Sequence, residues 1–371
     1  MRLGVDSVEL YHVQIPLREP WRVGSVEVHV KDAIVLRVQT SRGVGWGESS
    51  WAEGDSALVP TEDCCWDHLC RRLIPAVLSR GEVELESFCR VMADLDGGLP
   101  AMAGLEMALW HAAAMARDVP LHVLLRGVAR PIPSGLTVGL CSTVDELLDR
   151  IGRHLPCGYR RVKIAIRPGW DIEPVAGVRQ QWPDLALAVD AGGAYRLDDL
   201  PTLRNLDKYG LVMIEQPMPA DALDDSARLQ AVLSTPIGLS TSVKDVSTVR
   251  EIVRKQAGRI LRIDLGRAGG FAPAMEIHDA ACKGRLSCWL GTTPDLGIGA
   301  AAGLHLATLG GFVHPTDVGS SSRWFVDDLL EPPIVIDAGG YLHLPDGPGY
   351  GYRPNREKVE KYTIRHKILT A

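Results

Sequence analysis

Hydrophobic and polar residues alternate with a period of two along the N-terminal part of the chain, which is the pattern of half-buried strands. It predicts three strands of an antiparallel sheet, at residues 8–16, 26–40 and 43–48. Ser41, Arg42 and Gly43 provide a tight turn, so the second and third strands should form a hairpin. The segments 17–25 and 49–58 are expected to be loops.

From residue 61 the apolar positions recur every three to four residues, as on one face of a helix. This period predicts three helices, at residues 61–79, 82–95 and 102–117. Strands followed by a run of helices describe an α+β domain, which we assign to residues 1–125.

After residue 131, strand patterns and helix patterns alternate strictly. Strands are predicted at residues 132–140, 161–166, 186–190, 212–215, 236–240, 259–264 and 285–290. Helices are predicted between and after them, at residues 143–154, 171–181, 196–208, 226–233, 246–256, 272–283 and 298–309. The first of these helices begins with Thr143 and Glu146 at the spacing of a capping box. Such alternation is typical of a parallel α/β architecture.

Polar residues stand at the ends of five successive predicted strands, and they are 24 to 27 residues apart: Lys163, Asp190, Glu215, Ser240 and Asp264. This spacing corresponds to one strand and its crossover helix per step. A doubly wound open sheet is the alternative architecture. The run of units without a Gly-rich first turn favours a closed barrel, in which the strand ends converge on one face.

Composition limits the class of protein. With 371 residues, 46% of them hydrophobic and 23% charged, the chain is long enough for a barrel with an appended domain. A net charge of −6 and the lack of a Lys/Arg run argue against a nucleic-acid partner. The sequence shows neither a signal peptide nor a long apolar run, so we expect a cytoplasmic protein without a membrane anchor. The eight cysteines have no C-x-x-C pair, so neither zinc nor disulfides are predicted.

Asp190 and Glu215 are the first candidate pair for chemistry. On adjacent barrel strands their carboxylates would face one cavity, where they could hold a hard divalent cation or act in acid–base catalysis. The alternative for Asp190 is a helix N-cap before the glycines that follow it. Because Glu215 follows one unit later, a metal or acid–base role is favoured.

Three tracts in the barrel region, at residues 158–171, 182–195 and 214–217, resemble the enolase superfamily. The similarity is to its muconate-lactonising subgroup, which includes dipeptide epimerases, N-acylamino acid racemases and o-succinylbenzoate synthases. It implies an α+β capping domain and a modified TIM barrel of the (β/α)7β type. The capping domain would comprise residues 1–125 completed by 340–371, the barrel residues 126–339, and the protein would be a homo-oligomer.

The resemblance also implies a metal site. Such enzymes bind Mg²⁺ through acidic residues at the ends of the third, fourth and fifth barrel strands, and Asp190 and Glu215 match the first two. Ser240 stands where the third ligand is expected, so the magnesium site is incomplete and a protein without metal is the alternative.

The catalytic lysines of the family are also changed. The Lys-x-Lys pattern of the second strand is Lys163-Ile164-Ala165, which keeps the accessory lysine and loses the base, and Asp264 replaces the lysine of the sixth strand. Asp295 matches an acidic position after the seventh strand. His314 and Asp317 lie near the eighth strand end, where a lone histidine is more often structural.

Two hypotheses follow. The first is an isomerase, lyase or cyclase that acts on a carboxylate-bearing or amino-acid-like small molecule, with Asp264 as acid or base, Lys163 as electrostatic partner and Asp295 as a further catalytic group. Its substrate would be bound by residues of the two cap loops and of the strand ends: Trp21, Arg22, Trp51, Ser240, Thr292 and Thr293. The second is a catalytically inactive binding protein, because Ala165, Ser240 and Gly192 replace function-bearing side chains.

Overall fold

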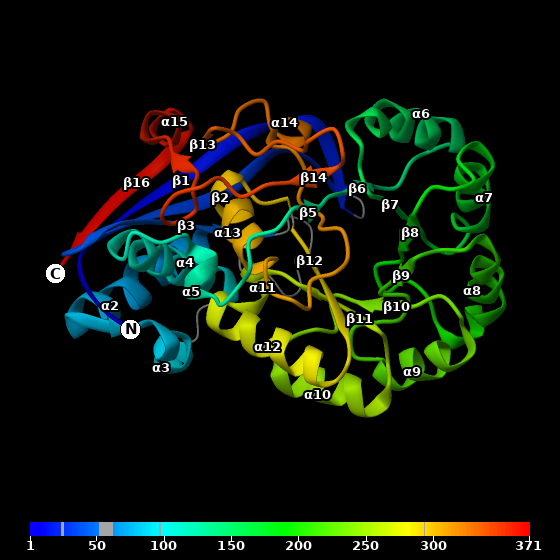
Figure 1. Cartoon of the computed structure of the whole chain (residues 1–371), viewed down its shortest axis with the longest axis horizontal. Coiled ribbons are helices and arrows are strands. Elements are labelled where there is room, and N and C mark those ends of the chain that lie inside the picture. Colours follow the sequence, from blue (N-terminus) through cyan, green and yellow to red (C-terminus); the bar gives the residue numbers. More distant parts are fainter. Residues whose placement is uncertain (24–25, 52–61, 96–97, 293) are drawn as a thin grey trace.

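The computed structural model describes residues 1–23, 26–51, 62–95, 98–292 and 294–371. An antiparallel sheet with its helices forms one end of the molecule, and a ring of helices around parallel strands forms the other (Figure 1). The two parts correspond to the two patterns of the sequence.

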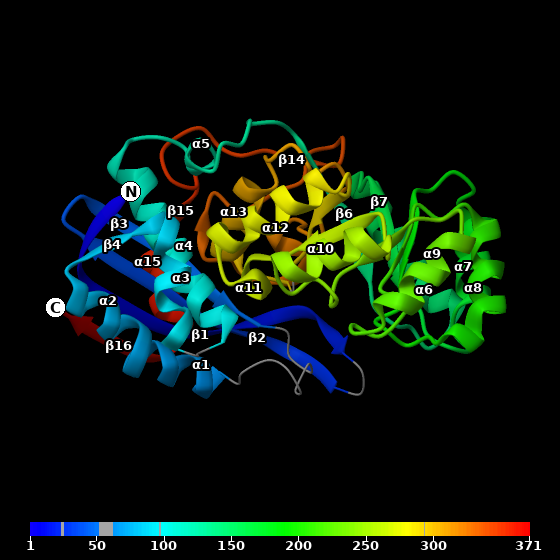
Figure 2. The ribbon, with the colours of Figure 1, turned by 90° about the horizontal axis from the view of Figure 1, so that it is seen from below.

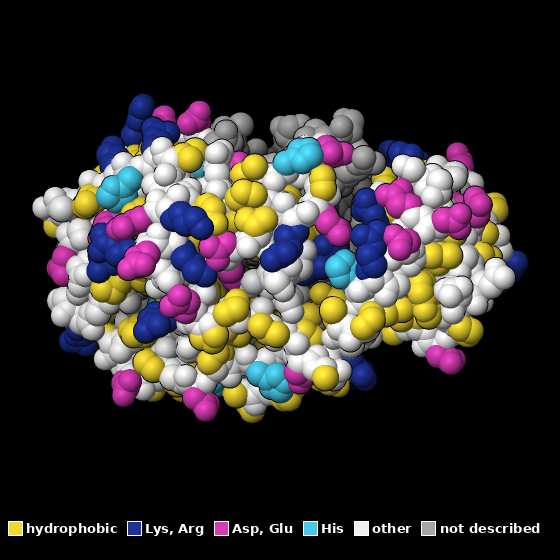
Figure 3. Space-filling view, turned by 90° about the horizontal axis from the view of Figure 1, so that it is seen from above, with side chains coloured by type: hydrophobic (Ala, Val, Ile, Leu, Met, Phe, Trp, Pro, Cys, Tyr) yellow, Lys and Arg dark blue, Asp and Glu magenta, His cyan; other side chains and the backbone are white. Residues whose placement is uncertain are grey.

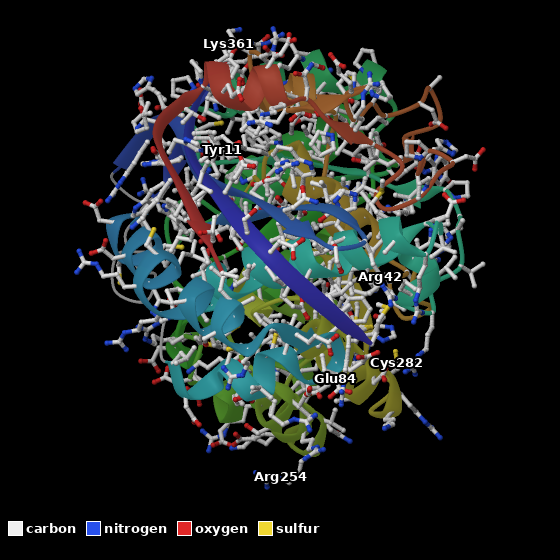
Figure 4. The ribbon with its side chains drawn as sticks, turned by 90° about the vertical axis from the view of Figure 1, so that its left-hand side faces the viewer. Tyr11, Arg42, Glu84, Arg254, Cys282 and Lys361 are labelled. Atoms are coloured by element: carbon white, nitrogen blue, oxygen red, sulfur yellow. The ribbon has the colours of Figure 1, made fainter. Side chains whose placement is uncertain are left out.

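The first part is built on an antiparallel sheet in the order β16-β1-β2-β3, with β4 paired to β1. Its strands are β1 (Arg2–Val23), β2 (Val26–Thr40), β3 (Gly43–Ser50), β4 (Glu82–Glu84) and β16 (Thr363–Thr370). The predicted hairpin is confirmed, since Thr40 of β2 pairs with Gly43 of β3. Figure 4 shows the C-terminal strand β16 beside β1, which carries Tyr11. We propose domain limits near residues 125 and 340 on this basis.

The loop predicted at residues 17–25 is wrong over its first seven residues. β1 continues to Val23, and Trp21 and Arg22 pair through their backbones with Val28 and Glu27. A shift of register between Pro16 and Trp21 explains the error, because it breaks the alternation from which a strand is recognised. The side chains of Trp21 and Arg22, and residues 52–58 of the second predicted loop, lie outside the described part of the chain.

The helices of this part are α1 (Glu62–His68), α2 (Ile74–Arg80), α3 (Phe88–Met92), α4 (Leu99–Ala116) and α5 (Leu121–Leu124). The first predicted helix comprises α1 and α2, joined by a π-helical turn. The second was predicted to begin at residue 82, which is wrong. Residues 82–84 form β4, in which only the central Val83 is buried, so the pattern there has a period of two.

Helix α4 crosses β3 at very short distance because β3 contains glycines. A Cβ atom on Gly45 would lie 1.9 Å from the carbonyl oxygen of Ala108, and one on Gly47 would lie 2.0 Å from that of Gly104. Any side chain at these positions would push α4 away from the sheet. The glycines therefore allow the close packing that buries α4 almost completely.

The second part contains seven parallel strands that pair in chain order. They are β6 (Gly135–Val138), β7 (Arg161–Ala165), β8 (Leu187–Asp190), β9 (Met213–Glu215), β10 (Ile237–Leu239), β11 (Ile260–Ile263) and β12 (Ser287–Leu290). The helices around them are α6 (Val144–His154), α7 (Ile172–Gln181), α8 (Leu200–Leu206), α9 (Leu223–Val232), α10 (Val246–Lys255), α11 (Leu265–Ala268), α12 (Phe271–Lys283) and α13 (Gly297–Leu306). Each strand is followed by at least one helix.

The segment 311–317 closes the sheet into a barrel. Cys288 N of β12 donates to Gly311 O at 2.8 Å, and Gly135 N of β6 donates to Thr316 O at 2.8 Å. One segment thus bonds to both edge strands, which excludes the open-sheet alternative and gives seven β/α units with an eighth closing strand. The predicted strand 132–140 is in fact divided, since β5 (Ile132–Pro133) leaves the barrel to pair with β14 (Tyr341–Leu342).

The remaining elements lie after the closing segment and are short: α14 (Ser321–Trp324), β13 (Leu330–Glu331), β15 (Arg353–Pro354) and α15 (Arg356–Lys361). Among the described residues, no helix combines the length and apolar character needed to cross a membrane. Figure 3 shows basic and acidic side chains intermixed over one face of the molecule.

Candidate active site

The carboxylates of Asp190 and Glu215, the first candidate pair, lie side by side. Asp190 ends β8, Glu215 ends β9, and the two residues are direct partners in the parallel ladder. Asp190 is partly buried, and Glu215 is only 1% exposed. The N-cap alternative for Asp190 is wrong, because α8 begins ten residues later at Leu200; the Asp190 carboxylate instead accepts from Gly192 N at 3.1 Å.

Lys163 of β7 lies between two acidic residues inside the barrel. Its Nζ donates to Glu215 Oε2 at 2.6 Å and to Asp317 Oδ2 at 3.1 Å. Although burial acts in the opposite direction, the charges of Asp317 and Glu215 raise the pKa of Lys163. The ammonium group is therefore permanently charged and suits an electrostatic role, not that of a base.

Asp317, in the closing segment, gathers donors from three strands. Its carboxylate accepts from Arg161, from Lys163 and from the indole nitrogen of Trp289, the last at 3.1 Å. Burial alone would raise its pKa, but the charges of Lys163 and Arg161 hold the pKa of Asp317 well below its ordinary value. The neighbouring His314 contacts Ser287 at 2.7 Å, and its structural role stays a prediction.

Arg262 of β11 brings a third cation to the strand ends. Its Nη2 lies 3.0 Å from Asp264 Oδ2, and its Nη1 lies 3.9 Å from Glu215 Oε1. Asp264 is also the N-cap of α11, where it accepts from Arg267 N at 3.2 Å. Asp264 and Arg262 line one small cavity together with Ser240, which is 6% exposed.

A second acidic pair links the barrel to the capping domain. Asp295 accepts from the hydroxyl of Thr292 at 2.8 Å, and Glu48 of β3 accepts from Leu296 N at 2.8 Å and Gly299 N at 2.7 Å, at the start of α13. Burial, and then the charge of Asp295, raise the pKa of Glu48 to about 8. Burial, and then the charge of Asp264, raise the pKa of Asp295. The carboxyl group of Glu48 can therefore hold a proton near neutral pH.

Asp190 also titrates near neutrality. Burial, and then the charge of Glu215, raise the pKa of Asp190 to about 6. A carboxyl group with such a pKa can exchange protons at physiological pH.

Three of the residues predicted to bind substrate are Trp51 in the capping domain and Thr292 and Thr293 after β12. Trp51 is 6% exposed and belongs to the hydrophobic core, and its carbonyl oxygen accepts from Lys31 Nζ at 2.7 Å. Its indole packs in the core, and the predicted contact of Trp51 with substrate stays a prediction. Thr293 lies outside the described residues, whereas Thr292 is partly buried beside Asp295.

The edge of the capping domain nevertheless reaches the barrel mouth. Figure 2 shows the ends of β1 and β2 extending from the cap toward the barrel. Arg18 Nε donates to Phe325 O at 2.9 Å, and Glu19 lies 3.5 Å from Arg323. The far end of the sheet is therefore fastened beside the strand ends.

Two family profiles match the chain. The N-terminal domain of mandelate racemase / muconate lactonizing enzyme matches residues 6–126, and a profile described as enolase C-terminal domain-like matches residues 146–358. The chain belongs to the muconate-lactonising subgroup of the enolase superfamily.

Relatives and solved structures agree with this membership. The chain is 35% identical over 376 residues to an o-succinylbenzoate synthase of Geobacillus stearothermophilus, covering 100% of both chains. It is 35% identical over 362 residues to an N-succinylamino acid racemase of an Amycolatopsis species, covering 97% of this chain and 98% of that one. The structure of a probable mandelate racemase from Alicyclobacillus acidocaldarius superposes with a TM-score of 0.90 at 32% identity and covers 99% of each chain.

These comparisons confirm the expected fold, a capping domain with a modified TIM barrel. They also confirm the expectation of an enzyme of the isomerase or lyase type, because the matched relatives are enzymes.

Members of this superfamily generally use Mg²⁺, which demands near-ideal octahedral oxygen coordination. The described residues contain no group of three or more His, Cys, Asp or Glu side chains that could hold a metal ion. Both oxygens of Glu215 face cationic side chains, and Ser240 offers a hydroxyl where a carboxylate is expected. The donor set therefore does not fit a magnesium ion held as the resemblance implies.

Arg262 and Asp317 are among the site residues that sequence reasoning missed. Arg262 interrupts the apolar run Ile260-Leu261-Arg262-Ile263, and a charged residue within a buried strand is a signal that needs a partner. Asp317 was noted only as a neighbour of His314, because the closing segment has no strand pattern of its own.

Proposed function

We propose that this protein catalyses acid–base chemistry on a small carboxylate-bearing or amino-acid-like molecule, as an isomerase, lyase or cyclase. The observation that carries the proposal is the combination of Arg262, 3.0 Å from Asp264, with Asp295, whose pKa is raised by burial and then by the charge of Asp264. A fixed cation thus lies beside the Asp264 carboxyl group, and the charge of Asp264 in turn favours the protonated form of Asp295, so the two groups can serve as base and acid.

The proposed roles follow from these charges. Asp264 would take a proton from the carbon next to the substrate carboxylate, and the negative charge that develops on the carboxylate oxygens would be stabilised by Lys163 and Arg262. Asp295 would return a proton to the substrate or to its leaving group. No step assigns a proton to Lys163, because its ammonium group is held by Glu215 and Asp317.

The relatives support the substrate class. The names of two of them, o-succinylbenzoate synthase and N-succinylamino acid racemase, both contain a succinyl group, which carries a carboxylate. We extend to this chain only that common feature. Racemisation or epimerisation of N-acyl amino acids and dipeptides is not expected, since the two lysine bases of the family are replaced by Ala165 and Asp264.

One observation favours the second candidate, a binding protein without catalysis. Lys163, Glu215, Asp317 and Arg161 satisfy one another in ion pairs inside the barrel, so this part of the site is neutralised without a substrate. Such a network would suit a rigid cavity as well as a catalytic one.

The Asp264→Asn substitution separates the two candidates. Asparagine is as good an N-cap as aspartate, so α11 should persist, whereas proton transfer is lost. We expect turnover of a responsive carboxylic acid, followed by nuclear magnetic resonance in deuterated water, to fall by about 10²- to 10⁴-fold.

Asp245→Asn is the matched control, because Asp245 caps α10 in the same way on an exposed part of the barrel, and its activity should equal that of the wild type. Full activity of Asp264→Asn would contradict the assigned role. A wild-type protein that binds carboxylic acids in calorimetry but converts none of them would favour the binding protein.

A further inference from the structure

Arg262 is an internal side chain of the barrel, although it belongs to a short strand of otherwise apolar residues. Its side chain is 14% exposed, and its guanidinium group donates to Thr292 O at 2.9 Å in addition to its contacts with Asp264 and Glu215. These partners come from β9, from the end of β11 itself and from the segment just after β12. The guanidinium is therefore held in one position by the barrel itself.

Gly291, just after β12, provides the space for this side chain. A Cβ atom on Gly291 would lie 1.8 Å from Arg262 Nε and 2.6 Å from its Cδ, far closer than any real contact. The backbone of Gly291 is not in the left-handed region, so the requirement is one of space. The barrel wall is thus shaped around Arg262, which marks it as a built part of the site.

The position of Arg262 completes the neutralisation of Glu215. Lys163 Nζ lies 2.6 Å from one carboxylate oxygen of Glu215, and Arg262 Nη1 lies 3.9 Å from the other. A divalent cation that used Glu215 as a ligand would have to displace the ammonium group, and it would stand within a few ångströms of two positive charges. Coordination of a cation by Glu215 therefore competes with these ion pairs.

We propose that the guanidinium group of Arg262, together with the ammonium group of Lys163, takes the place of a divalent cation at the strand ends, so that the site acts without bound metal. The two side chains supply fixed positive charge beside Glu215 and Asp264. Such charge stabilises the negative charge that develops on a substrate, as a metal ion would. The inference deepens the proposed function and rests on the same site, but its test does not require turnover.

Isothermal titration calorimetry of the full-length protein, freed of metal by a chelator, tests the proposal with MgCl₂ and with MnCl₂. We expect no saturable binding up to about 10 mM, which lies above the range of weak oxygen-ligand sites. Saturable binding of either ion at micromolar concentration by the wild type would overturn the proposal.

The double variant Arg262→Asn/Ser240→Asp removes the guanidinium and supplies the third carboxylate. It should bind Mg²⁺ at least about tenfold more tightly than the wild type. Ser240→Asp alone is the matched control: with Arg262 in place, it should not gain that affinity. Equal binding by the single and double variants would show that Arg262 does not exclude the metal, and would overturn the proposal.

Arg262→Lys is a control for a folding defect, because it keeps a positive charge at this position in the barrel. It should remain folded by circular dichroism and should still fail to bind Mg²⁺. The outcome is also distinct from that of the catalytic test. If Asp264→Asn is inactive while the wild type binds Mg²⁺ tightly, the proposal that Arg262 and Lys163 replace the metal ion is refuted and the catalytic proposal stands. If neither Mg²⁺ nor Mn²⁺ binds and the wild type converts no carboxylic acid, the catalytic proposal is refuted and the proposal on the metal ion stands.

Discussion

Asp317 shows how much a single side chain contributes inside this barrel. It is 7% exposed, and its carboxylate faces Arg161, Lys163, Trp289 and, at 3.4 Å, the hydroxyl of Thr137. Two of these four donors are buried cations that have left water and need a compensating negative charge. Asp317 is therefore the counter-ion that makes the basic residues of β7 tolerable in the interior.

The substitution Asp317→Asn should destabilise the fold strongly. It keeps the shape of the side chain but leaves Arg161 and Lys163 with one carboxylate fewer, and the loss of one partner from a buried ion pair costs about 3–5 kcal/mol. The free energy of unfolding, measured in urea, should fall by about 3 kcal/mol or more.

Asp67→Asn is its control, since Asp67 of α1 forms an exposed pair with Arg71 at 3.4 Å and the loss of this pair should hardly change stability. If the two variants were equally stable, the role of Asp317 as counter-ion would be refuted.

Among the individual residues, the sequence predicts part of the site, and there are physical reasons why it does not predict the rest. Asp190, Glu215 and Lys163 were found because each ends or lies in a strand, and the period of the units brings strand ends together. The contact of Arg262 with Glu215 depends on two strands that are not neighbours in the sheet, so no local pattern contains it. The burial of Trp51 was missed for the same reason, because it depends on packing between distant segments.

Among the elements, the start of α12 depends on a side chain from the other domain. Glu106 of α4, which is fully buried, accepts from Phe271 N and from Ala272 N, the latter at 2.9 Å. It also accepts from the indole nitrogen of Trp110 at 3.0 Å. Backbone amides at a helix start have no partner within the helix, so Glu106 acts as a capping group supplied by the capping domain.

This capping group predicts a pH dependence of stability. Burial raises the pKa of Glu106 from 4.5 to about 7, so between these values the folded protein holds a proton that the unfolded chain has released. Stability is therefore highest below this window and falls as the pH rises through it, by up to about 1.4 kcal/mol per pH unit for one group.

Urea unfolding at several pH values between 5 and 7 should show a smaller decline for Glu106→Gln than for the wild type, because glutamine does not titrate. Glu276→Gln removes an exposed carboxylate from α12 and should leave the wild-type slope unchanged. Identical slopes for all three proteins would rule out Glu106 as the titrating group.

For the whole molecule, the two patterns of the sequence identified the two domains but not how they join. Glu48 of β3 caps α13 and Glu106 of α4 caps α12, so two carboxylates of the capping domain hold two helices of the barrel. A single hydrophobic cluster also runs from the strands of the cap to the strands of the barrel. Such a junction depends on residues that are far apart in the chain, and their pairing leaves no periodic signal.

This junction predicts that the two domains unfold together. The apolar core is continuous, and the helix starts of the barrel are capped by side chains of the capping domain, so neither domain is complete alone. Scanning calorimetry of the wild type should therefore show one unfolding transition with equal calorimetric and van't Hoff enthalpies. The variant Glu48→Ala/Glu106→Ala leaves four backbone amides without their carboxylate partners, and each buried amide without a partner lowers the free energy of unfolding by about 1–3 kcal/mol. The variant should therefore have a lower melting temperature and a broadened or split transition. The control Asp67→Asn should melt like the wild type. Two separate transitions already in the wild type would show that the cap and the barrel are independent, and that the carboxylates fasten the domains without making them one folding unit.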